Sequence, residues 1–186
     1  MAAAAALLAA CDDPFAPRPR FETVATSFVV APLNTPLAGV PTVWRMGDLV
    51  AFRLDAIGRD FDLAFERDAG TAIRVIPSAR VIGGLAGLAG TSAPRVGILK
   101  VAGSYEALAI APERGYVVDS TQVVALGETF AVRSESSHCA VDPNGRREVF
   151  AKLVVDSVSA AGLVHLRTTV VRSCGYRSFN PGLPTN

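Results

Sequence analysis

Side chains that commonly carry catalysis or bind metals are few in this chain of 186 residues, which has only two histidines. His138 precedes Cys139, but a zinc site needs three or four ligands at characteristic spacings, and no second Cys/His pair stands nearby. His165 lies between apolar residues and is expected to be an exposed residue of a strand. We therefore predict no metal ion, no cofactor and no histidine-based catalysis.

Three carboxylates alternate with apolar residues along one predicted strand: Asp60, Asp62 and Glu66. Such groups ordinarily face solvent from the polar side of a strand. A pair of carboxylates about 5–10 Å apart would suit glycoside hydrolysis, which is the alternative for this face. The segment 142–145, Asp-Pro-Asn-Gly, has turn residues but lacks the further ligands of a calcium loop. No residue is therefore predicted to be catalytic.

A glycine-rich segment spans residues 81–92. A phosphate-binding loop requires G-x-x-x-x-G-K-[ST], whereas Gly90 is followed by Thr91 without a lysine. The segment is expected to be a loop between strands whose apolar residues press on a partner. The tail 178–186 contains two prolines and is expected to be disordered or docked. The candidate contact residues in these two segments are Gly83, Gly84, Leu85, Gly87, Leu88 and Phe179.

One of the three cysteines ends the longest apolar run, Met1 to Cys11, which is too short to cross a bilayer. The run closes with Leu-Ala-Ala-Cys and therefore resembles the lipobox of bacterial lipoproteins, although no charged residue opens it. The resemblance covers residues 1–11 alone. It implies that the leader 1–10 is removed, that Cys11 is acylated, and that the protein is held on the periplasmic side of the inner or the outer membrane.

The other two cysteines, Cys139 and Cys174, form an even pair, which is expected to be bridged in an oxidising compartment. In a flat three-stranded meander their backbones would lie about 9–10 Å apart, whereas a disulfide needs about 5.5–6 Å. We therefore expect either that the loops curl together or, as is natural in a sandwich, that the outer strands lie on different sheets. Upstream, the Pro-rich residues 11–20 favour an extended tether of roughly 25–30 Å.

The rest of the chain has the pattern of an all-β domain. Half of its residues are apolar and its net charge is +1, an ordinary globular balance without a basic patch for nucleic acid. Alternating runs at 50–56 and 60–66 predict a β-hairpin across Gly58. Further strands are expected at 21–31, 71–76, 96–101, 105–110, 115–118, 129–133, 148–158 and 163–171.

These strands predict one domain over residues 21–177, an immunoglobulin-like β-sandwich, with a small β-barrel as the runner-up. We expect a non-enzymatic, membrane-anchored envelope protein that serves as a structural or accessory subunit, or as a binding module, of a larger membrane-associated assembly. Its partners would be the membrane, through lipid on Cys11, and a protein that the sequence does not identify. The alternatives are a hydrolase of an unrecognised family and a periplasmic small-ligand-binding barrel.

Overall fold

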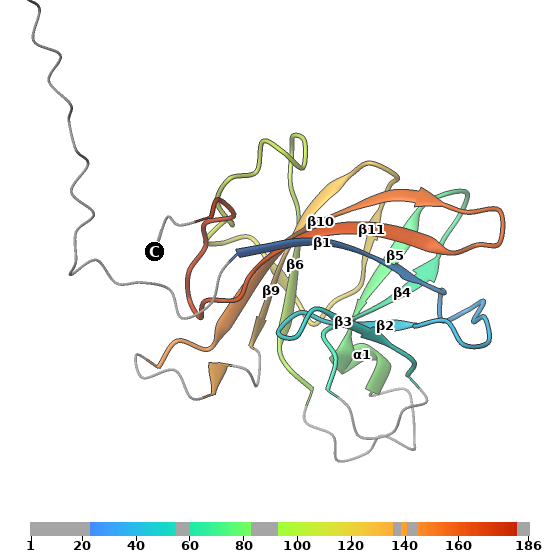
Figure 1. Ribbon diagram of the computed structural model, residues 1–186, viewed down its shortest axis with the longest axis horizontal. Helices are drawn as coiled ribbons and strands as arrows, with labels where there is room; N and C mark the ends of the chain where they lie inside the picture. Colours follow the sequence, from blue (N-terminus) through green and yellow to red (C-terminus); the bar gives the residue numbers. More distant parts are fainter. Residues whose placement is uncertain (1–22, 55–59, 83–92, 136–138, 141–144, 182–186) are drawn as a thin grey trace, which may run out of the picture.

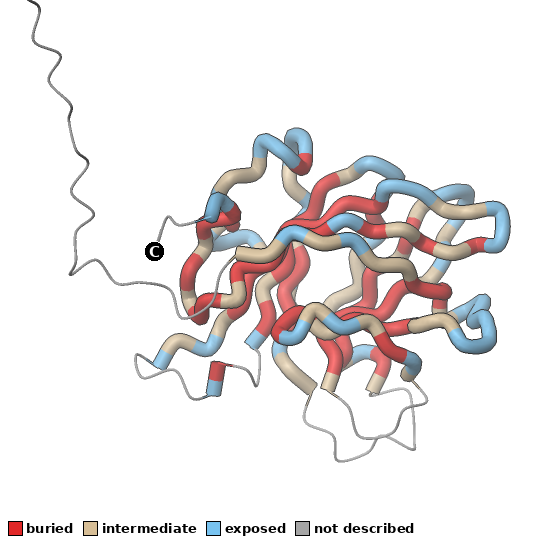
Figure 2. The backbone as a smooth tube through the Cα atoms, viewed as in Figure 1, coloured by how far each residue is buried: buried red, intermediate tan, exposed pale blue. Residues whose placement is uncertain are grey.

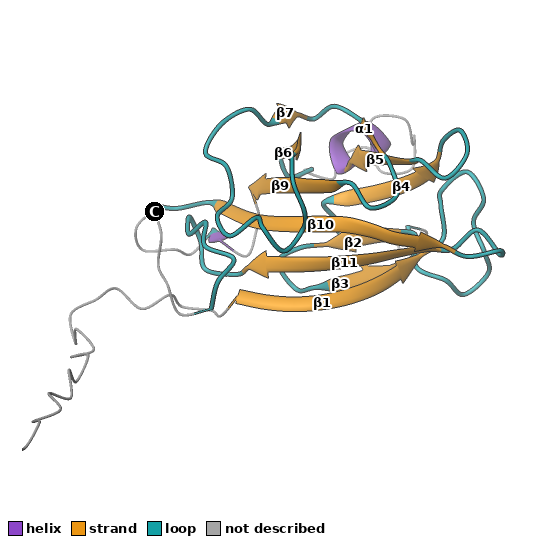
Figure 3. Ribbon diagram, turned by 90° about the horizontal axis from the view of Figure 1, so that it is seen from above, coloured by secondary structure: helices purple, strands orange, loops and turns teal. Residues whose placement is uncertain are grey.

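The computed structural model describes residues 23–54, 60–82, 93–135, 139–140 and 145–181. These residues form two antiparallel sheets packed face to face, six-stranded and five-stranded, which are not closed into a barrel (Figures 1 and 3). The all-β prediction is confirmed, and the small barrel is not what the described residues form. Among them, no helix is long and apolar enough to cross a bilayer.

The six-stranded sheet has the order β1-β11-β10-β9-β6-β7. Its central strands form the meander expected from the sequence, because β10 pairs with both β9 and β11. The turn between β10 and β11 contains Gly162 at φ +83°, a conformation that glycine adopts without strain. The strands of this sheet are β1 (Thr23–Val30), β6 (Val96–Lys100), β7 (Val117–Val118), β9 (Thr129–Glu135), β10 (Glu148–Val158) and β11 (Val164–Val171).

The five-stranded sheet has the order β3-β2-β4-β5-β8 and shows that the predicted hairpin is wrong. The strand β2 pairs with both β3 and β4, so it lies between the two runs that were expected to pair. A strand of three residues is too short to show the alternation that identifies strands. The strands are β2 (Val43–Arg45), β3 (Val50–Phe52), β4 (Leu63–Arg67), β5 (Ile73–Pro77) and β8 (Gln122–Val124).

Buried residues, red in Figure 2, occur along strands of both sheets. The main core lies between the sheets, and apolar clusters also cover part of each outer face. Across the core, Phe28 of β1 stacks on Trp44 of β2 with the ring centroids 4.8 Å apart. On the five-stranded sheet, a second cluster includes residues of the helix α1 (Ser78–Ile82). On the six-stranded sheet, a third cluster joins Phe150 of β10 to Phe179. Both sheets are therefore partly buried on two sides.

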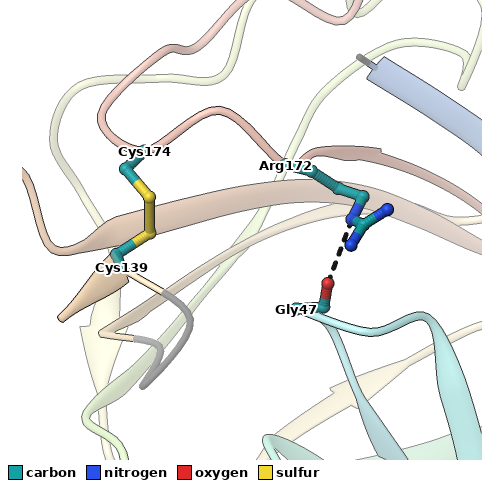
Figure 4. The surroundings of a disulfide bond; sticks show 4 residues. All are labelled: Gly47, Cys139, Arg172 and Cys174. Atoms are coloured by element: carbon teal, nitrogen blue, oxygen red, sulfur yellow. Dashed lines mark hydrogen bonds between the residues drawn. A yellow bond between two sulfur atoms is a disulfide. The ribbon is translucent and has the colours of Figure 1, made fainter. Parts of the chain in front are cut away.

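A disulfide joins Cys139 to Cys174 with the Cα atoms 5.7 Å apart, which confirms the predicted pairing (Figure 4). Of the two arrangements expected from the sequence, the one with the flanking strands on different sheets is wrong, since β9 and β11 flank β10 in one sheet. The two cysteines, which come after these strands in the sequence, are nevertheless brought together. Nearby, Arg172 donates from Nε to the carbonyl oxygen of Gly47 at 3.1 Å and so connects the two sheets (Figure 4).

The strand predicted at 105–110 is also wrong, because this segment belongs to a loop beside the six-stranded sheet. Within it, Ile110 forms one isolated bridge, with Ser178, and the backbone N–H of Phe179 donates to the carbonyl oxygen of Ala109 at 2.8 Å. Ser178 and Phe179, which the sequence placed in a tail, therefore dock on their own domain. Residues 182–186 lie outside the described part of the chain.

Candidate binding cleft

A cleft of about 450 Å³ opens where strands of both sheets begin or end. Arg45 ends β2, Glu135 ends β9, and Arg95 immediately precedes β6. The two sheets together therefore position the side chains of this cleft. Its described lining residues are Arg45, Asp60, Phe61, Asp62, Ala93, Pro94, Arg95, Glu135, Ala140 and Arg147.

The carboxylate of Asp62 links the two sheets beside this cleft. Asp62 is only 2% exposed, so the prediction that it faces solvent is wrong. It accepts a hydrogen bond from the backbone N–H of Met46 at 2.6 Å and another from the hydroxyl of Ser134. Met46 follows β2 in one sheet, whereas Ser134 lies in β9 of the other. Each oxygen of the carboxyl group thus has a donor.

Burial raises the pKa of Asp62 above its ordinary value, because removal from water disfavours the charged form. The hydrogen bonds from Ser134 and Met46 and the positive charge of Arg45 act in the opposite direction without reversing the shift. Because both carboxyl oxygens already accept hydrogen bonds inside the protein, we interpret Asp62 as a structural connection. It lacks the free oxygen that a general base would direct at a substrate.

Three guanidinium groups of the lining are incompletely paired. Arg45 forms an ion pair with Asp48, but its Nε is buried without a hydrogen-bond partner among the described residues. Arg95 has a 66% exposed side chain, 3.7 Å from the carboxylate of Glu135. Arg147 is exposed and has no ion-pair partner within the described ranges. The exposed guanidinium groups of Arg95 and Arg147 can bind a carboxylate or phosphate through paired N–H donors, beside the lining carboxylates of Asp60 and Glu135.

A second buried polar site lies on the six-stranded sheet and was missed from the sequence. Lys152 of β10 is 7% exposed, and its Nζ donates to the carbonyl oxygens of Tyr105 and Leu108 at 2.8 and 2.9 Å. The same Nζ lies 4.6 Å from the ring centroid of Tyr105 and 5.4 Å from that of Phe179. Burial lowers the pKa of Lys152. The sequence feature that could have indicated this site is a single lysine, Lys152, inside the Val-rich run 148–158.

The predicted lipidation site, Cys11, lies outside the described residues, as do most of the predicted contact residues, namely Gly83, Gly84, Leu85, Gly87 and Leu88. Phe179 is described and is 4% exposed, packed in the third cluster. This placement corrects its assignment as a contact for another protein, because its ring is used within the fold.

The remaining polar candidates do not come together. Asp60 lines the cleft, whereas Glu66 of β4 pairs with Arg74 at 3.2 Å. His165 of β11 is partly exposed, and His138 lies outside the described residues. In the described part of the chain, no group of three or more His, Cys, Asp or Glu side chains is placed to hold a metal ion.

Comparisons with protein-family models, with curated proteins and with solved structures gave no match for this chain. Its function is therefore argued from its own residues.

Proposed function

We propose that this protein is exported, held at the bacterial envelope by lipid on Cys11, and acts there as a non-catalytic binding module or accessory subunit of a membrane-associated assembly. The disulfide between Cys139 and Cys174 carries this proposal. Structural disulfides persist in oxidising compartments such as the periplasm. Because these two cysteines pair with each other, Cys11 is the remaining cysteine and is available for acylation.

The cleft supplies the binding surface in this proposal. The exposed groups of Arg95 and Arg147 favour an acidic segment of a partner subunit. Two antiparallel sheets packed over one core support the finer proposal of an immunoglobulin-like sandwich.

The test is the intact mass and the native-gel migration of the full chain, extracted in mild detergent from its own membranes. We expect a mass that corresponds to acylated Cys11 as the first residue, and migration within a large assembly. An unlipidated chain that migrates alone would overturn both parts of the proposal. Hydrolysis of ester, peptide or glycoside substrates that is abolished by one substitution would overturn the non-catalytic role.

A matched pair of charge reversals tests the cleft within the same experiment. Arg147→Glu should release the protein from its assembly, because it places a negative charge where an acidic partner is expected. Arg114→Glu makes the same change at an exposed arginine that is not among the lining residues of the cleft. Equal behaviour of the two variants would exclude the cleft as the contact.

A further inference from the structure

The four sheet edges of the described structure differ sharply in length. Three edge strands are short: β7 has two residues, and β3 and β8 have three each. The fourth, β1, has eight. Short edges protect a sheet from pairing with other chains, whereas a long edge presents a row of unpaired N–H and C=O groups. The unusual edge of this molecule is therefore β1, which lies at the side of the domain in Figure 3.

The composition of β1 also lacks the features that ordinarily prevent edge pairing. Its sequence, Thr-Val-Ala-Thr-Ser-Phe-Val-Val, contains no charged residue and no proline. Its pairing with β11 runs through all eight residues without a bulge. Lysine, proline and bulges are the usual means of blocking an edge. Within the described residues β11 is the one strand that pairs with β1, so no described strand occupies the outer side of β1.

We propose that β1 pairs antiparallel with β1 of a second copy of this chain, so that the two six-stranded sheets become continuous across a two-fold axis. An antiparallel pair of identical strands is compatible with two-fold symmetry, which closes the assembly at two copies. With the axis at Thr26, Val24 lies opposite Phe28 of the other copy, and Ala25 lies opposite Ser27. No like charges meet, because β1 has none.

The two faces of β1 fit this pairing. Phe28 stacks on Trp44 yet remains partly exposed, so an apolar neighbour on the same face would cover it further. Ala25 and Ser27 are exposed on the opposite face, where small side chains leave space for a close approach. The main-chain bonds would supply the affinity and the alternating side chains the register. The β1 strand of a second copy supplies both an apolar neighbour for Phe28 and small side chains opposite Ala25 and Ser27.

Charge substitution at the exposed positions tests the pairing. We would measure sedimentation of the full chain in mild detergent over a range of concentrations, and expect a dimer. The double variant Ala25→Lys/Ser27→Lys brings like charges together across the axis, and should raise the dissociation constant of the dimer at least about tenfold. The double variant Ala25→Glu/Ser27→Glu should do the same. Mixing the two variants should restore the dimer.

The mixture keeps the test independent of folding, because misfolded variants would not restore each other. Val123→Lys is the matched control, since Val123 is 41% exposed on the short edge strand β8, and it should leave the dimer intact. A monomer at every concentration would overturn the proposal, as would a dimer that tolerates the charged variants. A monomer whose β1 gains hydrogen-exchange protection only in native membranes would identify a strand of another protein as the occupant, and would also overturn it.

Discussion

Among the described residues, two acidic or basic side chains are buried, and the structure places them in different regions. Asp62 lies between the sheets and accepts hydrogen bonds, whereas Lys152 lies on one sheet and donates to the loop beside it. Their hydrogen-bond partners are neutral groups, and burial shifts the pKa of each toward the uncharged form, upward for Asp62 and downward for Lys152. Both residues thus hold parts of the fold together through hydrogen bonds to neutral groups.

The difference between them is what each one joins. Asp62 connects backbone and side chain from two sheets, so its loss should affect the whole domain. Lys152 fastens one loop to a sheet that is otherwise complete, so its loss should act locally. Three predictions test this contrast.

Asp62→Ala should have the largest effect, a loss of about 2–4 kcal/mol from the free energy of unfolding. It leaves two buried donors unsatisfied, and each such group costs about 1–3 kcal/mol. Urea unfolding of the full chain measures this loss. Ser134→Ala removes only one of the two hydrogen bonds and should destabilise by less. An equal loss in both variants would show that the bond from Met46 contributes nothing.

Lys152→Ala should cost less, about 1–3 kcal/mol, since it leaves two carbonyl oxygens without their donor and removes an ammonium group that lies near the rings of Tyr105 and Phe179. Hydrogen exchange should accelerate for residues 105–111 and 178–180, with little change in β9. Lys100→Ala is the control, because Lys100 is more exposed and its ion pair with Glu128 is worth little. Accelerated exchange throughout both sheets would contradict a local role for Lys152.

Asp62→Asn should change the free energy of unfolding least of the three variants, and this change should depend on pH. Since the folded state holds the proton of Asp62 more tightly than the unfolded state does, ionisation of this group lowers stability as pH rises from about 4 through its raised pKa. Asparagine cannot ionise, so the stability of the variant should improve relative to the natural protein across that range. Urea unfolding at several pH values measures the difference.

Glu113→Gln provides the matched control for this titration, because Glu113 is an exposed carboxyl group. Its stability profile should follow that of the natural protein. Parallel profiles for all three proteins would mean that Asp62 does not ionise differently on folding.

The long strands were predictable from sequence, and the short ones were not. Runs such as 148–158 carry enough β-branched residues to identify β10, and their turns contain Gly and Asn. Val43–Arg45 and Gln122–Val124 have only three residues each, so the position of β2 between β3 and β4 had no local signal. Strand order depends on contacts distant in sequence.

The candidate sites were less predictable, for reasons specific to their residues. Asp62 alternates with apolar neighbours as a surface carboxylate does, and only the folded structure brings Ser134 of the other sheet to it. A strand was expected at 105–110, but this segment is a loop in which the carbonyl oxygens of Tyr105 and Leu108 accept hydrogen bonds from Lys152. The disulfide was predicted correctly because the assignment of Cys11 to lipid left two cysteines, which allow a single pairing.

The disulfide has a mechanical consequence for a protein that, as proposed above, is held by lipid at one end. It spans 35 positions of sequence, which include all of β10 and β11. When the chain is stretched between its termini, force passes through the sulfur atoms, and the enclosed segment carries no tension. A fully extended chain should therefore be about 120 Å shorter than its reduced form, at about 3.4 Å per residue. Single-molecule stretching with and without a reductant would reveal this hidden length.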